Sequence, residues 1–168
     1  MGTHFYHGFL CEMLGTGINM QLGKLKDDKF DEFKKLFLDV FSNEPWFDKW
    51  ESDEQLTSYM RELIYNQNSL ALAFYDDNGI IAGGAMGYVF SWWSGPEYFI
   101  KEFFISRENQ NQGVGSAFLT QITDYLRSEG IRAVWLMTEK NIPAYHFYQK
   151  NGFNEAQENV LFWKRVKE

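Results

Sequence analysis

Cysteine and long apolar runs are scarce in this chain of 168 residues. The single cysteine, Cys11, excludes an internal disulfide and, without a cluster of histidine and cysteine, a zinc site. We therefore expect no metal and a reducing, cytoplasmic location. No apolar run reaches the ~18 residues that a membrane-spanning helix needs. The run around Phe9-Leu10 is too short and too polar in its flanks for a secretory signal, so we expect no membrane partner.

Basic residues are also in short supply. The chain has 16 Lys and Arg against 23 Asp and Glu, a net charge of −7. This balance argues against a nucleic-acid partner, which would require a basic stripe. It is compatible with a cationic substrate such as an amine, and also with solubility alone. Aromatic residues at 18% and hydrophobic residues at 45% exclude a disordered chain.

Hydrophobic periodicity divides the chain into strands and helices in the order β-α-α-β-β-β-α-β-α-β. That order predicts a mixed α/β sandwich around one sheet. We expect residues 1–17 to be an extension outside the fold and residues 18–168 to form a single domain. Strands are predicted at 18–25, 70–75, 80–89, 97–106, 133–138 and 159–165, and helices at 28–40, 53–64, 116–126 and 143–150. Asp27 or Asp28 is the expected cap of the first helix, and Ser52 or Asp53 that of the second.

A glycine turn joins the apolar strand at Tyr98–Ile105 to the helix at Ser116–Leu126. Its residues are Gln110–Gly115, with the sequence QNQGVG. Main-chain N–H groups of such a turn converge at the positive end of a helix and form an anion site. No lysine follows the second glycine, which excludes a P-loop, and the sixth position counted from Gly113 is Phe118, which excludes a dinucleotide fingerprint. A turn without a ligand is the alternative.

The pattern Q/R-x-x-G-x-G/A after an apolar strand resembles the pyrophosphate loop of the GNAT acetyltransferases. A second motif, NIPAYHFYQKNGF at Asn141–Phe153, closely resembles the GNAT signature N-x-x-A-x-x-F-Y-x-x-x-G-F. With both motifs in the family's order, the chain is identified as a member over roughly residues 70 to 165. Gln110 stands where Arg is commoner and Asn111 where Gly is common, which implies modest cofactor affinity.

The resemblance implies an α/β (α+β) fold with a mixed, mostly antiparallel central sheet flanked by helices. The sheet should splay between the fourth and fifth strands. Acetyl-CoA would enter there as cosubstrate, with its pyrophosphate on the glycine turn and its pantetheine arm along the central strand. The cofactor-binding residues implied are Phe103, Phe104, Ile105, Gln110, Asn111, Gln112, Gly113, Val114, Gly115, Ser116, Asn141 and Phe147. A Cβ at Gly113 or Gly115 is expected to collide with the phosphates.

Two residues are predicted to be catalytic. Tyr148 matches the family's proton donor to the departing sulfur, and a phenol with a pKa near 10 stays protonated at neutral pH. Glu102 is unusual in so apolar a strand, where it could accept the amine's proton or bind the ammonium. A salt bridge to Lys or Arg, or pairing at the sheet's end, is the alternative. The N–H of Phe104 or Ile105 would polarise the thioester carbonyl. Strict alternation places one set of side chains on the same face: Tyr98, Ile100, Glu102 and Phe104.

Aromatic residues interleaved with carboxylates precede the central strand and suit a small, cationic acceptor with a primary amine. The predicted substrate residues are Trp46, Asp48, Trp93 and Tyr98. The same residues could instead form core or dimer contacts, so a homodimer stays open. The predicted function is N-acetyl transfer; a non-catalytic CoA sensor or interaction module, and a different acyl group, are the alternatives.

Overall fold

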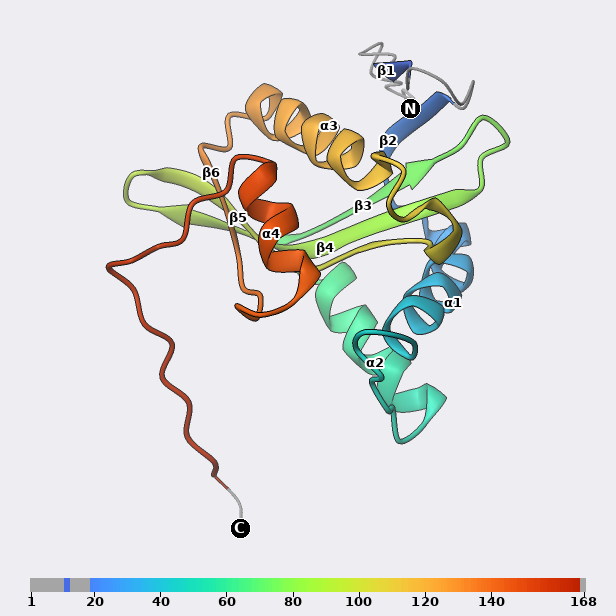
Figure 1. Ribbon diagram of the computed structural model, residues 1–168, viewed down its shortest axis with the longest axis horizontal. Coiled ribbons are helices and arrows are strands. Elements are labelled where there is room, and N and C mark those ends of the chain that lie inside the picture. Colours follow the sequence, from blue (N-terminus) through green and yellow to red (C-terminus); the bar gives the residue numbers. More distant parts are fainter. Residues whose placement is uncertain (1–10, 13–18, 167–168) are drawn as a thin grey trace. The chain divides into compact units, whose positions relative to one another are not determined.

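A computed structural model describes residues 11–12 and 19–166, in two compact units of residues 1–137 and 138–168. The first unit contains one sheet with the strand order β1-β2-β3-β4-β5-β6 (Figure 1). Every neighbouring pair is antiparallel except β5 and β6, which are parallel, so the predicted mixed, mostly antiparallel sheet is confirmed. The strands are β1 (Cys11–Glu12), β2 (Asn19–Lys24), β3 (Ser69–Tyr75), β4 (Ile81–Trp92), β5 (Gly95–Ile105) and β6 (Ala133–Leu136). Pairing of β1 with β2 joins two residues of the predicted extension to the sheet; the rest of that extension lies outside the described residues.

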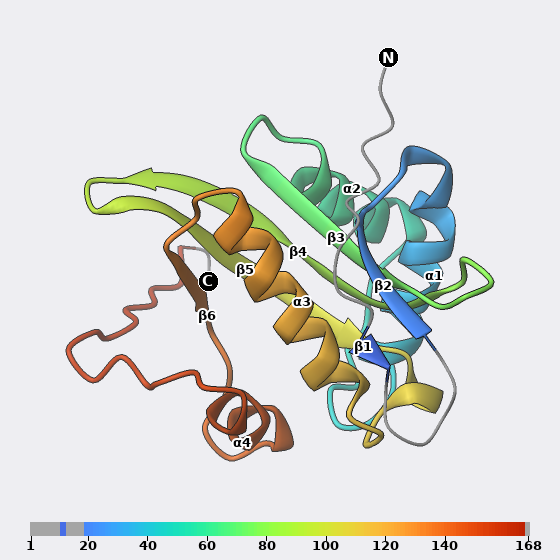
Figure 2. The ribbon, with the colours of Figure 1, turned by 90° about the horizontal axis from the view of Figure 1, so that it is seen from above.

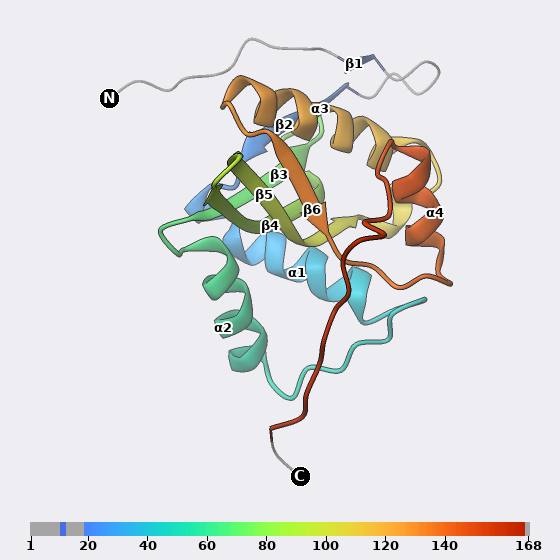
Figure 3. The same ribbon diagram turned by 90° about the vertical axis from the view of Figure 1, so that its left-hand side faces the viewer.

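Helices cover both faces of this sheet (Figure 3). One face carries α1 (Phe30–Phe41) and α2 (Asp53–Ile64), and the other carries α3 (Val114–Ser128), which Figure 2 shows from above. Short 3-10 turns lie at Asp27–Lys29 and Arg107–Asn109. Each face has its own apolar core: Phe33 and Phe37 belong to the first, and Phe118 and Ile122 to the second. None of the helices in the described ranges is long and apolar enough to cross a bilayer.

The predicted helix starts are right in one case and wrong in the other. Ser52 caps α2, because its hydroxyl accepts a hydrogen bond from the Gln55 N–H at 3.2 Å. Neither Asp27 nor Asp28 caps α1, which follows directly from a 3-10 turn with Lys29 at its N-cap and no side-chain bond there. The two aspartates lie in that turn, where their charges still favour a helix N-terminus.

Strand β5 contains a bulge that sequence alternation did not anticipate. Met86 of β4 pairs with Glu102, whereas the next residue, Gly87, pairs with Ile100, so Lys101 is an extra residue. A Cβ at Gly87 would lie 1.9 Å from the Phe99 carbonyl oxygen, which means that only glycine allows this close approach.

The bulge reverses the side-chain faces of β5, so the predicted single face is wrong. Tyr98 and Ile100 lie in the core under α3, and Phe104 lies in the core under α1 and α2. Glu102 points toward α2 as well, because it contacts Tyr59. Without the extra residue, Glu102 would share the α3 face with Tyr98.

Strands β5 and β6 pair over only a short stretch. Their parallel register runs from Glu97 opposite Ala133 to Ile100 opposite Leu136, while β5 continues to Ile105. In the described part of the chain, residues 102–105 therefore pair with β4 on one side and extend beyond β6 on the other. This is the predicted splay between the fourth and fifth strands of the domain, which are β5 and β6 here.

The second unit contains α4 (Pro143–Lys150), at the predicted position and with proline at its start. Gly152 follows in a left-handed conformation, with φ of 86°, and ends the helix. The predicted strand at 159–165 is wrong, because this stretch has no regular secondary structure. Its apolar side chains, including Leu161 and Phe162, are exposed, so an alternating pattern alone did not produce a strand.

Candidate active site

The glycine turn connects β5 to α3 and presents the start of that helix. Ala117 is the first residue to donate an intrahelical bond, to the Gly113 carbonyl at 3.0 Å. The N–H groups of Val114, Gly115 and Ser116 precede it, and the first turn of a helix offers such groups no intrahelical acceptor. No side chain caps this end. The turn therefore has the donors and the partial positive charge of an anion site.

Backbone conformation explains the first glycine of this turn. Gly113 has φ of 83°, in the left-handed region, and Asn111 also has a positive φ of 59°. A Cβ at Gly113 would meet no protein atom within 4 Å, so the glycine is required by its φ angle and not by crowding within the chain. Gly115 lies inside α3. The predicted collision with phosphates therefore stays a prediction.

Amide side chains hold the turn from within the protein. The Gln110 amide donates to the Ile105 carbonyl at 3.0 Å, and the Gln112 amide donates to the Glu108 carbonyl at 2.6 Å. Gln110, which stands where the family pattern more often has Arg, thus links the turn to the end of β5 and has a structural role.

The end of β5 offers a second set of main-chain groups. The Ser106 N–H donates to the Ala82 carbonyl of β4 at 2.8 Å. Because successive N–H groups of a strand point to opposite sides, the Ile105 N–H points away from β4, toward the edge that β6 does not reach. The side chains of Phe104 and Ile105 are buried, so this edge is defined by backbone.

Glu102 lies near this edge and is held by α2. The Tyr59 hydroxyl donates a hydrogen bond to its Oε1 atom. Burial raises the pKa of Glu102 above its ordinary value of 4.5, while the Tyr59 hydrogen bond and the Lys101 charge act to lower it. Among the residues that the structure describes, the partner that Glu102 contacts is a neutral phenol and not the Lys or Arg of the predicted salt bridge. A carboxyl with a raised pKa is suited to accepting a proton near neutral pH.

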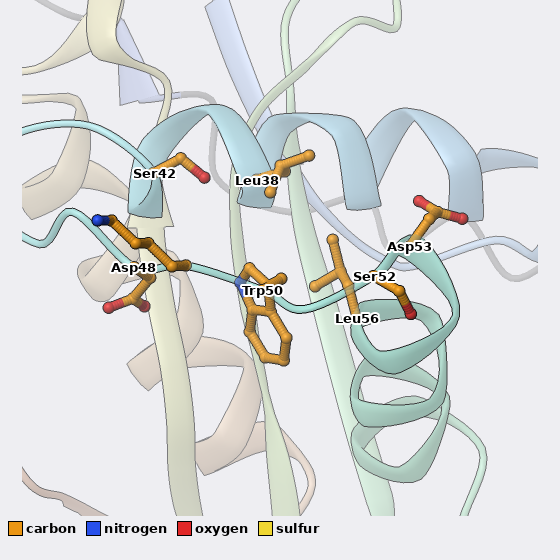
Figure 4. A pocket seen from close by; sticks show the side chains of 8 residues that line it. Leu38, Ser42, Asp48, Trp50, Ser52, Asp53 and Leu56 are labelled. Carbon is orange, nitrogen blue, oxygen red and sulfur yellow. The ribbon is translucent and has the colours of Figure 1, made fainter.

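A pocket of ≈ 510 Å³ opens between the end of α1, the following loop and the start of α2 (Figure 4). Asp48 and Trp50 contribute to its wall, and Lys49 supplies a cation beside them. The Trp50 ring lies 5.1 Å from the Tyr59 ring, and the Asp48 charge acts to raise the pKa of Glu102. Two residues of the pocket wall thus bear on Glu102: Trp50 packs against its partner Tyr59, and Asp48 acts on it through its charge. Its lining consists of Leu38, Ser42, Asp48, Lys49, Trp50, Ser52, Asp53 and Leu56.

The predicted substrate residues are in very different surroundings. Tyr98 is fully buried, and its hydroxyl donates to the Leu70 carbonyl at 2.9 Å, so it belongs to the core and we withdraw it as a substrate contact. Trp46 is half-buried against Phe41 at 5.7 Å between ring centres. Trp93 is 89% exposed at the turn between β4 and β5. Asp48 is exposed and is the predicted substrate residue that lines the pocket.

The second motif forms the compact start of the second unit. Tyr148 is half-buried on α4, with its ring 5.3 Å from Phe147 and 5.5 Å from Phe153. Its main chain is fixed as well, because the Phe153 N–H donates to the Tyr148 carbonyl at 3.1 Å. Asn141 is exposed just before α4. The roles of Asn141, Phe147 and Tyr148 toward the cofactor stay predictions.

The sequence of the chain matches a known protein family over most of its length. The model of the acetyltransferase (GNAT) family matches residues 30–153, from the start of α1 to the end of the second motif. The chain belongs to the GNAT acetyltransferase family. This acetyltransferase has no match among curated proteins.

Solved structures share the fold at low sequence identity. The aminoglycoside acetyltransferase meta-AAC0020 from an uncultured soil metagenomic sample, in complex with sisomicin, is 19% identical, with 88% of this chain and 97% of that chain covered and a TM-score of 0.68. The aminoglycoside 6'-N-acetyltransferase AAC(6')-Ih from Acinetobacter baumannii is 18% identical, with 88% and 99% covered and a TM-score of 0.65. AAC(6')-Iy in complex with CoA is 16% identical, with 92% and 99% covered and a TM-score of 0.69. These likenesses establish the fold of this acetyltransferase.

Sequence reasoning missed two features of the acetyltransferase's site. Tyr59 sits on α2 among residues that the helical pattern assigns to the surface or the core, and nothing in its spacing connects it with Glu102. The bulge at Lys101 decides that Glu102 faces α2 at all. A signal for the bulge was present in Gly87, a glycine within an apolar strand, where close backbone approach is a common cause.

Proposed function

We propose that this acetyltransferase moves an acetyl group from acetyl-CoA directly to the primary amine of a small, cationic acceptor. One observation carries the proposal: a half-buried carboxylate with a raised pKa, Glu102, lies on the same strand whose end leads into the start of α3, where main-chain N–H groups are exposed without a side-chain cap. Family membership supports the acyl donor. Named aminoglycoside acetyltransferases with the same fold support a cationic acceptor.

The glycine turn is proposed to bind the pyrophosphate of the cosubstrate. The N–H groups of Gly113, Val114, Gly115 and Ser116 would donate to its oxygens, assisted by the dipole of α3. The exposed main chain of Asn111 and Gln112 adjoins them. No lysine or arginine belongs to the turn itself, so main-chain donors would dominate the affinity.

The open edge of β5 is proposed to hold the pantetheine arm and the thioester. The Ile105 N–H points to that edge, where it would donate to the thioester carbonyl oxygen as negative charge develops on it. The main chain of Phe103 and Phe104 continues the edge. Asn141 and Phe147 are the further contacts of the arm that the family resemblance implies.

Proton transfers complete the reaction. Glu102 would accept a proton from the bound ammonium, directly or through water, which leaves a neutral amine able to attack the thioester carbon. A C–N bond then forms and the C–S bond breaks, while the Tyr148 hydroxyl would give its proton to the departing sulfur. The attacking nitrogen would lose its second proton to solvent, and solvent would return a proton to the Tyr148 phenolate. The products are the N-acetylated amine and free CoA.

The pocket beside Trp50 is the proposed entry for the acceptor. Asp48 offers a carboxylate and Trp50 an aromatic ring, a combination that suits a cationic amine. The exposed Trp93 and the half-buried Trp46 are proposed as outer contacts. Tyr98 is no longer part of this set.

An amine panel with detection of released thiol tests the function. Aminoglycosides, polyamines, amino-acid-like amines and peptide N-termini would be compared, each with acetyl-, propionyl- and succinyl-CoA. We expect turnover with at least one cationic amine and preference for the acetyl donor. Binding of CoA in calorimetry without turnover across the panel would favour a CoA sensor instead, and no CoA binding would refute both functions.

A further inference from the structure

We propose that Tyr59 is a positioning residue that orients Glu102 and tunes its proton affinity. The inference rests on the proposed function, in which Glu102 is the base. Tyr59 lies on α2, and its hydroxyl donates to the Glu102 Oε1 atom across the face of the sheet. One helix residue thus holds the carboxylate of a residue far away in the sequence.

The Tyr59 side chain is itself firmly held. Its ring packs against Trp50, with 5.1 Å between ring centres, and against Phe37 at 6.4 Å. Trp50 comes from the loop before α2 and Phe37 from α1, so three separate segments fix the phenol. A hydroxyl positioned in this way selects one orientation of the Glu102 carboxylate and leaves its second oxygen for another partner.

Charges and dipoles around Glu102 act in opposite directions. Burial raises its pKa, and the Asp48 carboxylate in the loop acts in the same sense. The Tyr59 hydroxyl on α2 and the Lys101 ammonium on β5 favour the ionised form. Tyr88 of β4 influences Tyr59 and not Glu102 in this balance. Removal of the Tyr59 hydroxyl should therefore raise the pKa of Glu102 further.

Tyr59 acts as a donor and not as a second acid. Its pKa is raised well above the ordinary phenol value of 10.0, first by burial and then by the Glu102 charge. The phenol consequently stays protonated throughout the pH range in which Glu102 titrates. A change of the pH profile in a Tyr59 variant would then report on the carboxylate alone.

The first test follows Glu102 itself, independently of turnover. The carboxyl carbon of ¹³C-labelled glutamate is titrated by NMR in the wild type and in Tyr59→Phe, with Glu102→Gln used to assign the signal. We expect the midpoint to rise by about one pH unit in Tyr59→Phe, as for loss of one hydrogen bond to a charged group. Tyr88→Phe is the matched control, because the Tyr88 hydroxyl donates to the Glu62 carbonyl at 3.0 Å. The midpoint of Glu102 in this variant should stay at the wild-type value. An unchanged midpoint in Tyr59→Phe overturns the proposal.

The second test uses kcat/KM against pH with the best amine of the panel. Tyr59→Phe should move the acidic limb to higher pH, and thermal melting verifies that the variant is folded. Combined with Glu102→Gln, the same substitution should lower kcat/KM by less than about twofold, because its effect passes through the carboxylate. An equal loss in both backgrounds would make Tyr59 merely structural. If the wild type transfers no acetyl group, the proposed function fails while the NMR titration still decides the Tyr59–Glu102 pairing.

Discussion

At the scale of the residue, Glu102 combines three properties that are rarely found together. It lies in an apolar strand, burial raises its pKa, and its direct partner is a neutral hydroxyl and not a cation. A neighbouring cation would stabilise the ionised carboxylate and lower its pKa. With a neutral partner instead, the carboxylate keeps a pKa closer to that of the amine from which it would accept a proton. This is the residue on which the proposed chemistry depends most.

Substitution Glu102→Gln should lower kcat/KM by roughly 10²- to 10⁴-fold, the usual contribution of general acid–base catalysis. In the wild type, activity should fall as the pH drops through the raised pKa of Glu102, because the protonated form cannot accept the amine's proton. The variant should lack this acidic limb. Steady-state rates across pH measure both effects, with Glu62→Gln, at an exposed position of α2, as the control. Retention of the limb in Glu102→Gln would assign it to another group.

Gly113→Ala should weaken CoA binding by roughly 5- to 30-fold, because the turn should relax away from its φ of 83° and CoA binding would have to restore that conformation at a cost of about 1 to 2 kcal/mol. Gly130 at the other end of α3 is a matched control, with φ of 74° and equally open space around its Cβ position. Gly130→Ala should lose similar stability in a thermal melt without a change in the calorimetric Kd for CoA. Equal affinities for the two variants would speak against the turn as the anion site.

At the scale of the element, the geometry of β5 matters more than its composition. An extra residue at Lys101 turns Glu102 toward α2, and the early end of β6 leaves the last residues of β5 with an open edge. Both features are consequences of how strands pair, and the proposed site on this strand depends on them.

Gly87→Ala should destabilise the protein by about 3 kcal/mol or more, because the new methyl group would meet the Phe99 carbonyl and the Lys101 N–H. Urea unfolding measures this loss. Gly79→Ala, in the open hairpin turn with φ of 74°, should lose only about 1 to 2 kcal/mol. A loss at Gly87 no greater than at Gly79 would mean that the bulge relaxes easily.

The elements themselves were largely predictable from sequence, whereas their pairing details were not. The cap at Ser52, the hairpin turn before Ile81 and the helix after the glycine turn follow from local chemistry. The orientation of Glu102 depends on a bulge, and its contact with Tyr59 depends on tertiary packing that no local pattern encodes. For the same reason the sequence left Tyr98 open as a substrate contact or a core residue, and the structure shows that it is a core residue whose hydroxyl donates to the Leu70 carbonyl.

At the scale of the whole molecule, the proposed reaction divides into two steps carried by different residues. Binding of the acyl donor is proposed for the glycine turn and the open edge of β5, and protonation of its leaving group for Tyr148 on α4. The two steps should separate experimentally.

Tyr148→Phe should slow turnover by roughly 10- to 10⁴-fold while the affinity for CoA changes little. Calorimetry measures the affinity, and single-turnover kinetics measure the chemical step. Tyr145→Phe is a control on the same helix, since the Tyr145 hydroxyl donates to Glu155 at 3.1 Å. Unchanged single-turnover rates in Tyr148→Phe would remove this residue from the mechanism.

The most direct measurement follows the main-chain amides of the glycine turn by NMR while CoA or pantetheine is added. We predict that CoA shifts the N–H signals of Gly113, Val114 and Gly115, and that pantetheine, which lacks the diphosphate, leaves them in place. Saturable binding of CoA with these three signals unmoved would contradict the account.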